Sequence, residues 1–125
     1  MGSKKNILIC DDKVMNRKLI EAMLIGYAYT LIETESGLEC LDVMQRIGDT
    51  VDLILLDINM KDMSGIDVCR ALRSWSHCNK IPIIAYTASV MRGEREKYLA
   101  AGFDEILMKP TTDNDLFTML NTFIV

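Results

Sequence analysis

The sequence has no apolar segment long enough to span a membrane and no excess of positive charge. Its most apolar window, residues 22–32, is interrupted by Gly26 and falls short of the ~20 residues that a membrane-spanning helix needs. No apolar segment of a secretion signal precedes it. The formal net charge is −4 at pH 7, which gives no general attraction to nucleic-acid phosphates or anionic lipid. We therefore expect a cytoplasmic protein that does not insert into membranes or bind nucleic acid directly.

Signals for zinc binding and for disulfide bonds are also missing. The 4 cysteines have no C-x-x-C spacing, and the single histidine, His77, completes no zinc pattern. We expect all four thiols to be reduced and mostly buried as small hydrophobic side chains. No repeat or linker divides the chain. Residues 1–3 resemble the remnant of an expression tag, and residues 4–125 are predicted to form one domain, because a chain of 125 residues can bury a single core.

Short apolar segments alternate along the chain with amphipathic ones. Leu53–Leu56 is a run of four large apolar residues without alternation, which is typical of a strand buried on both faces of a parallel sheet. Further strands are predicted at residues 5–10, 29–33, 81–86 and 103–108, and helices at 16–26, 38–47, 64–75, 91–101 and 116–124. Five strands that alternate with five helices over short loops predict an α/β fold, (βα)5, in which helices cover both faces of a five-stranded parallel sheet.

Local signals support several of these helix boundaries. Ser36-x-x-Glu39 and Ser64-x-x-Asp67 have the form of a capping box. Glycines at 26 and 102 are expected to end their helices. In each of four predicted helices, apolar residues recur at helical spacing and share one face, which predicts the side chains that enter the core. In chain order they are Leu19, Met23 and Leu24; Leu38, Leu41, Met44 and Ile47; Val68, Leu72 and Trp75; and Leu116, Met119, Leu120, Phe123 and Ile124.

Polar residues stand at the ends of four predicted strands. Asp11 and Asp12 follow the first strand, Asp57 the third, Thr87 the fourth and Lys109 the fifth. Each has an ordinary explanation by itself, such as an acidic turn, a helix cap, a satisfied hydroxyl or a surface lysine. In a parallel sheet, however, the carboxyl ends of the strands face one crevice. Agreement at four strand ends makes coincidence a poor explanation, so we expect these side chains to form one site.

Three carboxylates in one crevice repel one another unless a proton or a cation joins them. Oxygen ligands with room for water suit Mg²⁺ or Mn²⁺ better than Zn²⁺. A cation next to a hydroxyl and an ammonium is suited to neutralise and hold a phosphoryl group. A carboxylate can then serve as the nucleophile and form an aspartyl phosphate. The reaction class that these residues indicate is phosphoryl transfer to aspartate.

Four segments of the sequence resemble the receiver domain of two-component response regulators. The resemblance covers the chain from Lys5 on and implies a flavodoxin-like arrangement of the sheet. Two shorter stretches, Met15-Asn16-Arg17 and Asp57-Ile-Asn-Met60, are most similar to the receivers of hybrid sensor histidine kinases. The four segments are Asp11-Asp12, residues 52–65, residues 83–88 and residues 101–110.

The resemblance implies a role for each residue of the site. Asp57 is expected to accept a phosphoryl group from a phosphohistidine of a histidine kinase or histidine phosphotransfer domain, in a self-catalysed transfer that is followed by autodephosphorylation. Mg²⁺, or Mn²⁺ in its place, is expected to bind Asp12, Asp57 and the backbone carbonyl of Asn59 directly, and Asp11 through a water. The phosphoryl oxygens would be held by Thr87, by the backbone N–H groups of Asn59 and Ala88, and by Lys109.

Further expectations concern the signal that leaves the site. The resemblance implies that the Lys109–Pro110 bond is cis, with a probability well above the ~5–6% base rate for X-Pro bonds. The fourth helix, fifth strand and fifth helix are expected to form the surface that binds a downstream partner. Phosphorylation is expected to shift the relative populations of the conformations of this surface. No DNA-binding segment is expected after the fifth helix.

Two positions depart from the pattern of the family. Lys61 stands four residues after Asp57, where proline is common. Ile106 stands three residues before Lys109, where receivers usually have a tyrosine or phenylalanine whose inward rotation reports phosphorylation. Thr87 can still act as a switch, and Tyr86 is a candidate to take the place of the missing aromatic side chain.

Two other functions fit part of the pattern. A haloacid-dehalogenase-like phosphatase also uses a strand-end aspartate and Mg²⁺, but it requires a second aspartate two residues later, where this chain has Asn59. A receiver-like module could also signal by binding alone, without phosphorylation. The complete set of acidic, hydroxyl and ammonium groups argues against this second alternative.

Overall fold

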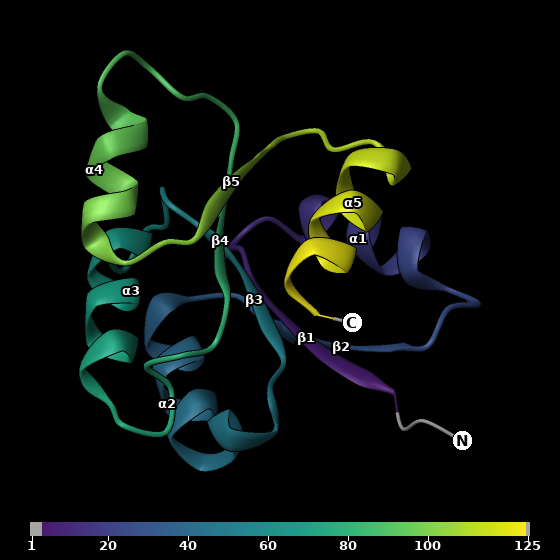
Figure 1. The fold of residues 1–125 in the computed structure, drawn as a ribbon, viewed down its shortest axis with the longest axis horizontal. Coiled ribbons are helices and arrows are strands. Elements are labelled where there is room, and N and C mark those ends of the chain that lie inside the picture. The colour runs from purple at the N-terminus through teal and green to yellow at the C-terminus, as the bar shows by residue number, and fades with distance from the viewer. Residues whose placement is uncertain (1–3, 125) are drawn as a thin grey trace.

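The computed structural model describes residues 4–124, and the tag remnant predicted at residues 1–3 lies outside them. Within the described residues, five strands alternate with five α-helices (Figure 1). The strands are β1 (Lys5–Cys10), β2 (Tyr29–Thr34), β3 (Leu53–Asp57), β4 (Ile83–Thr87) and β5 (Glu105–Met108). The helices are α1 (Val14–Leu24), α2 (Gly37–Ile47), α3 (Gly65–Ser74), α4 (Glu94–Ala101) and α5 (Asp113–Phe123), and a short 3-10 helix, η1 (Gly48–Thr50), follows α2.

All strand pairs are parallel, and the strand order in the sheet is β2-β1-β3-β4-β5. Helices α1 and α5 lie on one face of the sheet, and α2, α3 and α4 lie on the other (Figure 1). The predicted (βα)5 fold is therefore confirmed. Strand β3 is central and all five of its residues are buried, as its uninterrupted apolar run predicts.

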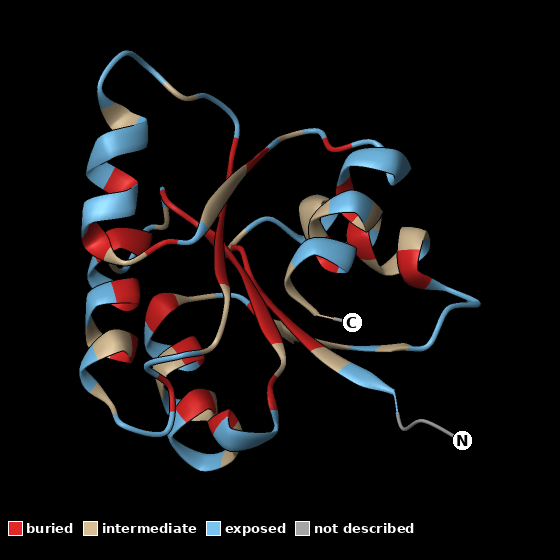
Figure 2. Ribbon diagram, viewed as in Figure 1, coloured by how far each residue is buried: buried red, intermediate tan, exposed pale blue. Residues whose placement is uncertain are grey.

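The sheet separates two hydrophobic cores because successive side chains of a strand point to opposite faces. Leu53 and Leu55 of β3 pack towards α1 and α5, whereas Ile54 and Leu56 pack towards α2, α3 and α4. Figure 2 shows the buried residues concentrated along the central strands and on the helix faces that cover them. All four cysteines are free and buried, which confirms the prediction. No helix within residues 4–124 is long and apolar enough to cross a membrane.

Several element boundaries differ from the prediction, and α5 begins at Asp113 instead of residue 116 because Thr112 caps it. Helix α1 occupies residues 14–24 instead of 16–26, and Gly26 follows in a turn with a φ of 88°. Helix α4 begins at Glu94 instead of residue 91, because Gly93 has a left-handed φ of 85° that a right-handed helix excludes. Strand β4 begins at Ile83 because Pro82 before it has no N–H group for the ladder. Strand β5 begins at residue 105, since the Phe103 N–H still bonds to the end of α4 at 3.2 Å.

One predicted core position on the helices also needs correction. Leu38 is 66% exposed, because it lies in the first turn of α2, where its N–H donates to the Asp62 carboxylate at 2.9 Å. Trp75 follows the last residue of α3 and is half-buried against the core. The cap at Ser36 forms as predicted, since its hydroxyl accepts the Glu39 N–H at 3.0 Å.

Candidate functional site

Three carboxylates meet at the carboxyl edge of the central strands. Asp11 and Asp12 follow β1, and Asp57 is the last residue of β3. Because β1 and β3 are neighbours in register, with Cys10 opposite Leu56, their ends lie side by side. One carboxylate oxygen from each of the three residues lies within 4.8 Å of the others. Asp11 and Asp57 are both buried, so the cluster is set into the sheet edge and does not project into solvent.

The Lys109 ammonium bridges two of these carboxylates. Its Nζ atom lies 2.8 Å from Asp11 Oδ2 and 3.2 Å from Asp57 Oδ1. The same atom lies 5.1 Å from the ring centroid of Tyr86, within the range of a cation–π contact. The lysine follows β5, and its backbone N–H donates to the Thr87 carbonyl of β4 at 2.8 Å. The next peptide bond, Lys109–Pro110, is cis.

Burial and neighbouring charges act on the pKa of Asp57 in opposite directions. Burial raises its pKa above the ordinary value, the attraction of Lys109 opposes this rise, and the repulsion of Asp11 adds to it. The Asn59 N–H donates to Asp57 Oδ1 at 3.3 Å and also favours the ionised form. One ammonium therefore compensates a set of three acidic groups incompletely, and a further cation would stabilise the ionised cluster.

The turn after β3 is as tight as the backbone allows. The Gly65 N–H donates to the Ile58 carbonyl at 2.8 Å. A Cβ atom at Gly65 would collide with the backbone carbonyl oxygen of Asp57. The first residue of α3 is thus packed directly against the backbone that carries Asp57.

Asp12 has the features of a metal ligand. Its Oδ2 atom accepts the Lys61 N–H at 3.3 Å, whereas its Oδ1 atom is buried without a hydrogen-bond partner among the described residues. A buried carboxylate oxygen without a partner is costly unless a cation or an ordered water satisfies it. Carboxylate and carbonyl oxygens are the donors that Mg²⁺ and Mn²⁺ prefer. The residues present therefore fit a hard divalent cation.

Of the predicted phosphate-holding groups, Lys109 and the Asn59 N–H contact Asp57, whereas the Thr87 hydroxyl has another partner. Thr87 ends β4 and is buried, and its hydroxyl donates to the Ser89 carbonyl at 3.2 Å. Ala88 and Asn59 are exposed. Lys61, in place of the usual proline, is exposed as well, and its N–H is the donor to Asp12.

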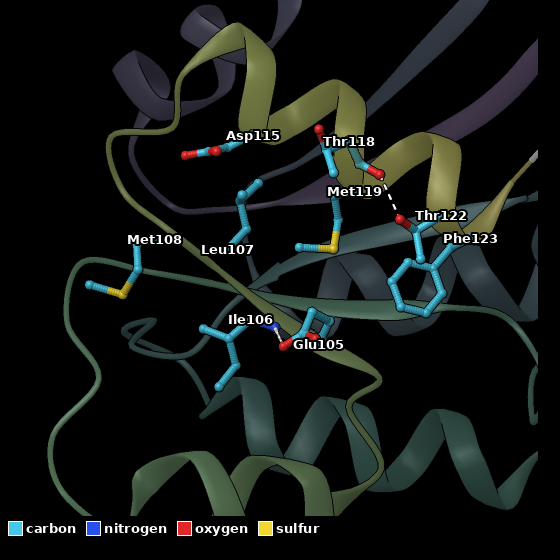
Figure 3. Close-up of a pocket in the computed structure, with 9 residues that line it drawn as sticks. All are labelled: Glu105, Ile106, Leu107, Met108, Asp115, Thr118, Met119, Thr122 and Phe123. Carbon is cyan, nitrogen blue, oxygen red and sulfur yellow. Dashed lines mark hydrogen bonds between the residues drawn. The ribbon is translucent and has the colours of Figure 1, made fainter.

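The structure does not support Tyr86 as a substitute for an aromatic residue at position 106. Ile106 pairs in register with Ala85 and packs towards α4, whereas Tyr86 is buried in the core on the opposite face of the sheet. Figure 3 shows Ile106 on the other side of β5 from Leu107 and Met119. A pocket of about 420 Å³ lies between β5 and α5. Its lining includes Glu105, Ile106, Met108, Met119 and Phe123.

Two side chains that hold Asp11 and Asp12, the acidic loop after β1, were not predicted from the sequence. The Asn16 amide donates to Asp11 Oδ2 at 3.0 Å, and Arg17 Nη1 donates to the Asp11 carbonyl oxygen at 2.7 Å. Both residues appeared in the sequence only as a mark of a subgroup of receivers. Their place in the first turns of the helix that follows the acidic pair was the available signal, because that helix starts at the mouth of the crevice.

Comparisons with known proteins show which family this chain resembles. A family model described as the response regulator receiver domain matches residues 7–121. The chain is 35% identical over 106 residues to the polar-differentiation response regulator DivK of Brucella ovis, and the match covers 85% of each chain. It is 33% identical over 125 residues to hybrid signal transduction histidine kinase I of Dictyostelium discoideum, where the match covers 96% of this chain and 7% of the kinase.

Solved structures agree as well. The receiver domain of a Pseudomonas aeruginosa sensor histidine kinase, solved with a magnesium ion in its active-site cleft, has a TM-score of 0.87, 30% identity and 98% coverage of both chains. A receiver from Saccharomyces cerevisiae, solved in complex with a histidine phosphotransfer protein, has a TM-score of 0.86 and 22% identity over 98% of this chain and 90% of that one. Strand order, acidic cluster and family match lead to one conclusion: this chain belongs to the family of response regulator receiver domains of two-component signalling.

Proposed function

We propose that this receiver accepts a phosphoryl group on Asp57 from a phosphohistidine, with Mg²⁺ as cofactor. The observation that carries the proposal is the convergence of three carboxylates with an ammonium that bridges Asp11 and Asp57. Asp57 is the member at the end of the central strand. Its side chain is fixed by Lys109 and by the Asn59 N–H, so the nucleophile is oriented before a donor arrives.

The transfer exchanges one bond to phosphorus for another. A carboxylate oxygen of Asp57 forms the new O–P bond while the N–P bond to the donor imidazole breaks, and the electron pair of that bond stays on the imidazole nitrogen. Asp12, Asp57 and the Asn59 carbonyl would hold Mg²⁺, with Asp11 acting through a water. When bound, the cation neutralises charge on the phosphoryl oxygens.

Side chains and backbone N–H groups of this chain would stabilise the negative charge on the phosphoryl oxygens that the cation leaves. Lys109 lies close enough to Asp57 to pair with one phosphoryl oxygen. The Thr87 hydroxyl would leave the Ser89 carbonyl to donate to another, and the backbone N–H groups of Asn59 and Ala88 would complete the set. Because the Thr87 hydroxyl would change its partner, phosphorylation would shift the relative populations of the conformations of the loop between β4 and α4.

We further propose that residues 4–125 form a single receiver domain of a cytoplasmic phosphorelay. A histidine kinase or a histidine phosphotransfer protein would donate the phosphoryl group, and the surface of α4, β5 and α5 would bind the downstream partner. One solved structural neighbour is a receiver bound to a phosphotransfer protein. Two matched proteins are histidine kinases, which supports a hybrid-kinase setting. A receiver that signals without phosphorylation is the alternative.

A small phosphodonor tests the proposal directly. Incubation with acetyl phosphate and Mg²⁺ is expected to add one phosphoryl group, seen by intact-mass spectrometry and removed by hydroxylamine, which cleaves acyl phosphates. The same incubation with excess EDTA is the control. A protein that gains no mass with Mg²⁺, or gains as much with EDTA, would overturn the proposal and favour the alternative.

Magnesium is also expected to stabilise the fold through Asp12. Binding to the folded state alone adds about 2.7 kcal/mol to the free energy of unfolding at a Mg²⁺ concentration 100 times the dissociation constant. Asp12→Asn removes the carboxylate whose buried oxygen lacks a partner, so most of this gain should be lost. Urea unfolding with and without Mg²⁺ measures both values. Asp67→Asn, at an exposed position of α3, should keep the full gain, and an equal gain in the Asp12 variant would remove that residue from the site.

A further inference from the structure

Arg17 is placed to control the backbone of the acidic loop. It lies in α1, one turn after the loop, and its side chain is only 11% exposed. Its Nη1 atom donates to the Asp11 carbonyl oxygen at 2.7 Å. We propose that Arg17 is a positioning residue for the divalent cation, acting through the Asp11–Asp12 peptide. The inference rests on the proposed function, because it assigns Arg17 to the same metal site.

The peptide that Arg17 holds is the first one beyond the sheet. The Asp11 N–H donates to the Thr34 carbonyl at 3.1 Å, which continues the ladder of β1 and β2 by one bond. The Asp11 carbonyl belongs to the next peptide plane, between Asp11 and Asp12, and accepts its hydrogen bond from Arg17 and not from a neighbouring strand. A peptide is rigid and planar, so a bond to this carbonyl fixes the plane from which Asp12 projects. Arg17 thus supplies the donor that the sheet does not.

The two aspartates depend on this bond to different degrees. The Asp11 side chain is already held by the Lys13 N–H at 2.9 Å, by Asn16 at 3.0 Å and by Lys109 at 2.8 Å. Within residues 4–124, the Asp12 side chain accepts only the long bond from the Lys61 N–H and keeps one buried oxygen without a partner. The orientation of the Asp12 side chain therefore depends on the backbone that carries it. Loss of Arg17 should disturb the orientation of Asp12 more than that of Asp11.

The other side of the guanidinium is anchored to the end of β2. Its Nε atom lies 3.0 Å from Glu33 Oε1, and its Nη2 atom lies 3.7 Å from Glu35 Oε2. The Glu33 hydrogen bond orients the guanidinium, and both carboxylates offset its charge, so Arg17 holds the loop without adding an unpaired positive charge beside a cation site. A lysine has no planar fork and cannot make these bonds in the same geometry.

Metal titration of the purified protein tests the inference without an activity assay. Isothermal titration with Mg²⁺ is compared for the wild type, Arg17→Ala, Arg17→Lys and Lys18→Ala. Lys18 is a matched control, because it is an exposed cation 3.7 Å from the same Glu33. Arg17→Ala is expected to weaken Mg²⁺ binding about tenfold, the lower range for loss of a group that orients a metal ligand. Arg17→Lys should restore part of the affinity, and Lys18→Ala should change it less than twofold.

Each outcome decides between a positioning role and a general one. Equal Mg²⁺ affinity of Arg17→Ala and the wild type would overturn the inference, and so would an equal loss in Lys18→Ala, since that loss would reflect charge alone. If Arg17→Ala does not fold, Arg17→Lys takes its place, and wild-type affinity in that variant would overturn the inference. A wild type that binds no Mg²⁺ would instead refute the proposed function itself, so the two failures are distinguishable.

Discussion

Replacing Asp57 by asparagine is expected to abolish phosphoryl acceptance completely. The variant keeps the size of the side chain and removes the anionic oxygen that attacks phosphorus. Intact-mass spectrometry after incubation with acetyl phosphate and Mg²⁺ should show the full phosphoryl adduct in the wild type and none in the variant.

The control for this result is Asp67→Asn, which removes an exposed carboxylate from the first turn of α3. It should be labelled to the same extent as the wild type. Circular dichroism should show that both variants remain folded. An Asp57→Asn protein that still gains a hydroxylamine-sensitive phosphoryl group would move the acceptor to another carboxylate and overturn the assignment of Asp57.

Gly65→Ala is expected to lower the free energy of unfolding by about 3 kcal/mol, at the upper end of the usual cost of overpacking. The new Cβ would meet the Asp57 carbonyl group and lie 3.0 Å from Ile58 Cα. These atoms are backbone at the end of the central strand, so they cannot move aside as a flexible side chain can. Urea unfolding without metal measures the loss, and Mg²⁺ affinity should fall with it because Asp57 is displaced.

Gly93→Ala is the matched control for this substitution. Its Cβ would meet no atom within 4 Å, and its cost comes only from the φ of 85°, about 1 kcal/mol. Gly65 has no positive φ, so the pair separates lack of space from backbone strain. If Gly65→Ala destabilised the protein no more than Gly93→Ala, the close packing of α3 against the β3 terminus would not have the importance that we assign to it.

The sequence by itself was sufficient for the fold class and for the set of candidate site residues. The uninterrupted apolar run of β3 and the helical spacing of its neighbours are local patterns, and a parallel sheet brings all strand ends to one edge. Asp11, Asp57 and Lys109 could therefore be grouped before any distance was known. The boundary of α4 could not, because the left-handed conformation of Gly93 is one of several that glycine adopts freely.

Only the tertiary structure decided how these residues contact one another. The register of β4 against β5, with Ala85 opposite Ile106, is a long-range property, and it places Tyr86 on the face away from Ile106. The contact of Arg17 with the acidic loop could not be predicted either, because its acceptor is a backbone carbonyl that no side-chain pattern reveals. Local spacing determines which residues stand at strand ends, whereas packing between distant segments determines which atoms lie within bonding distance.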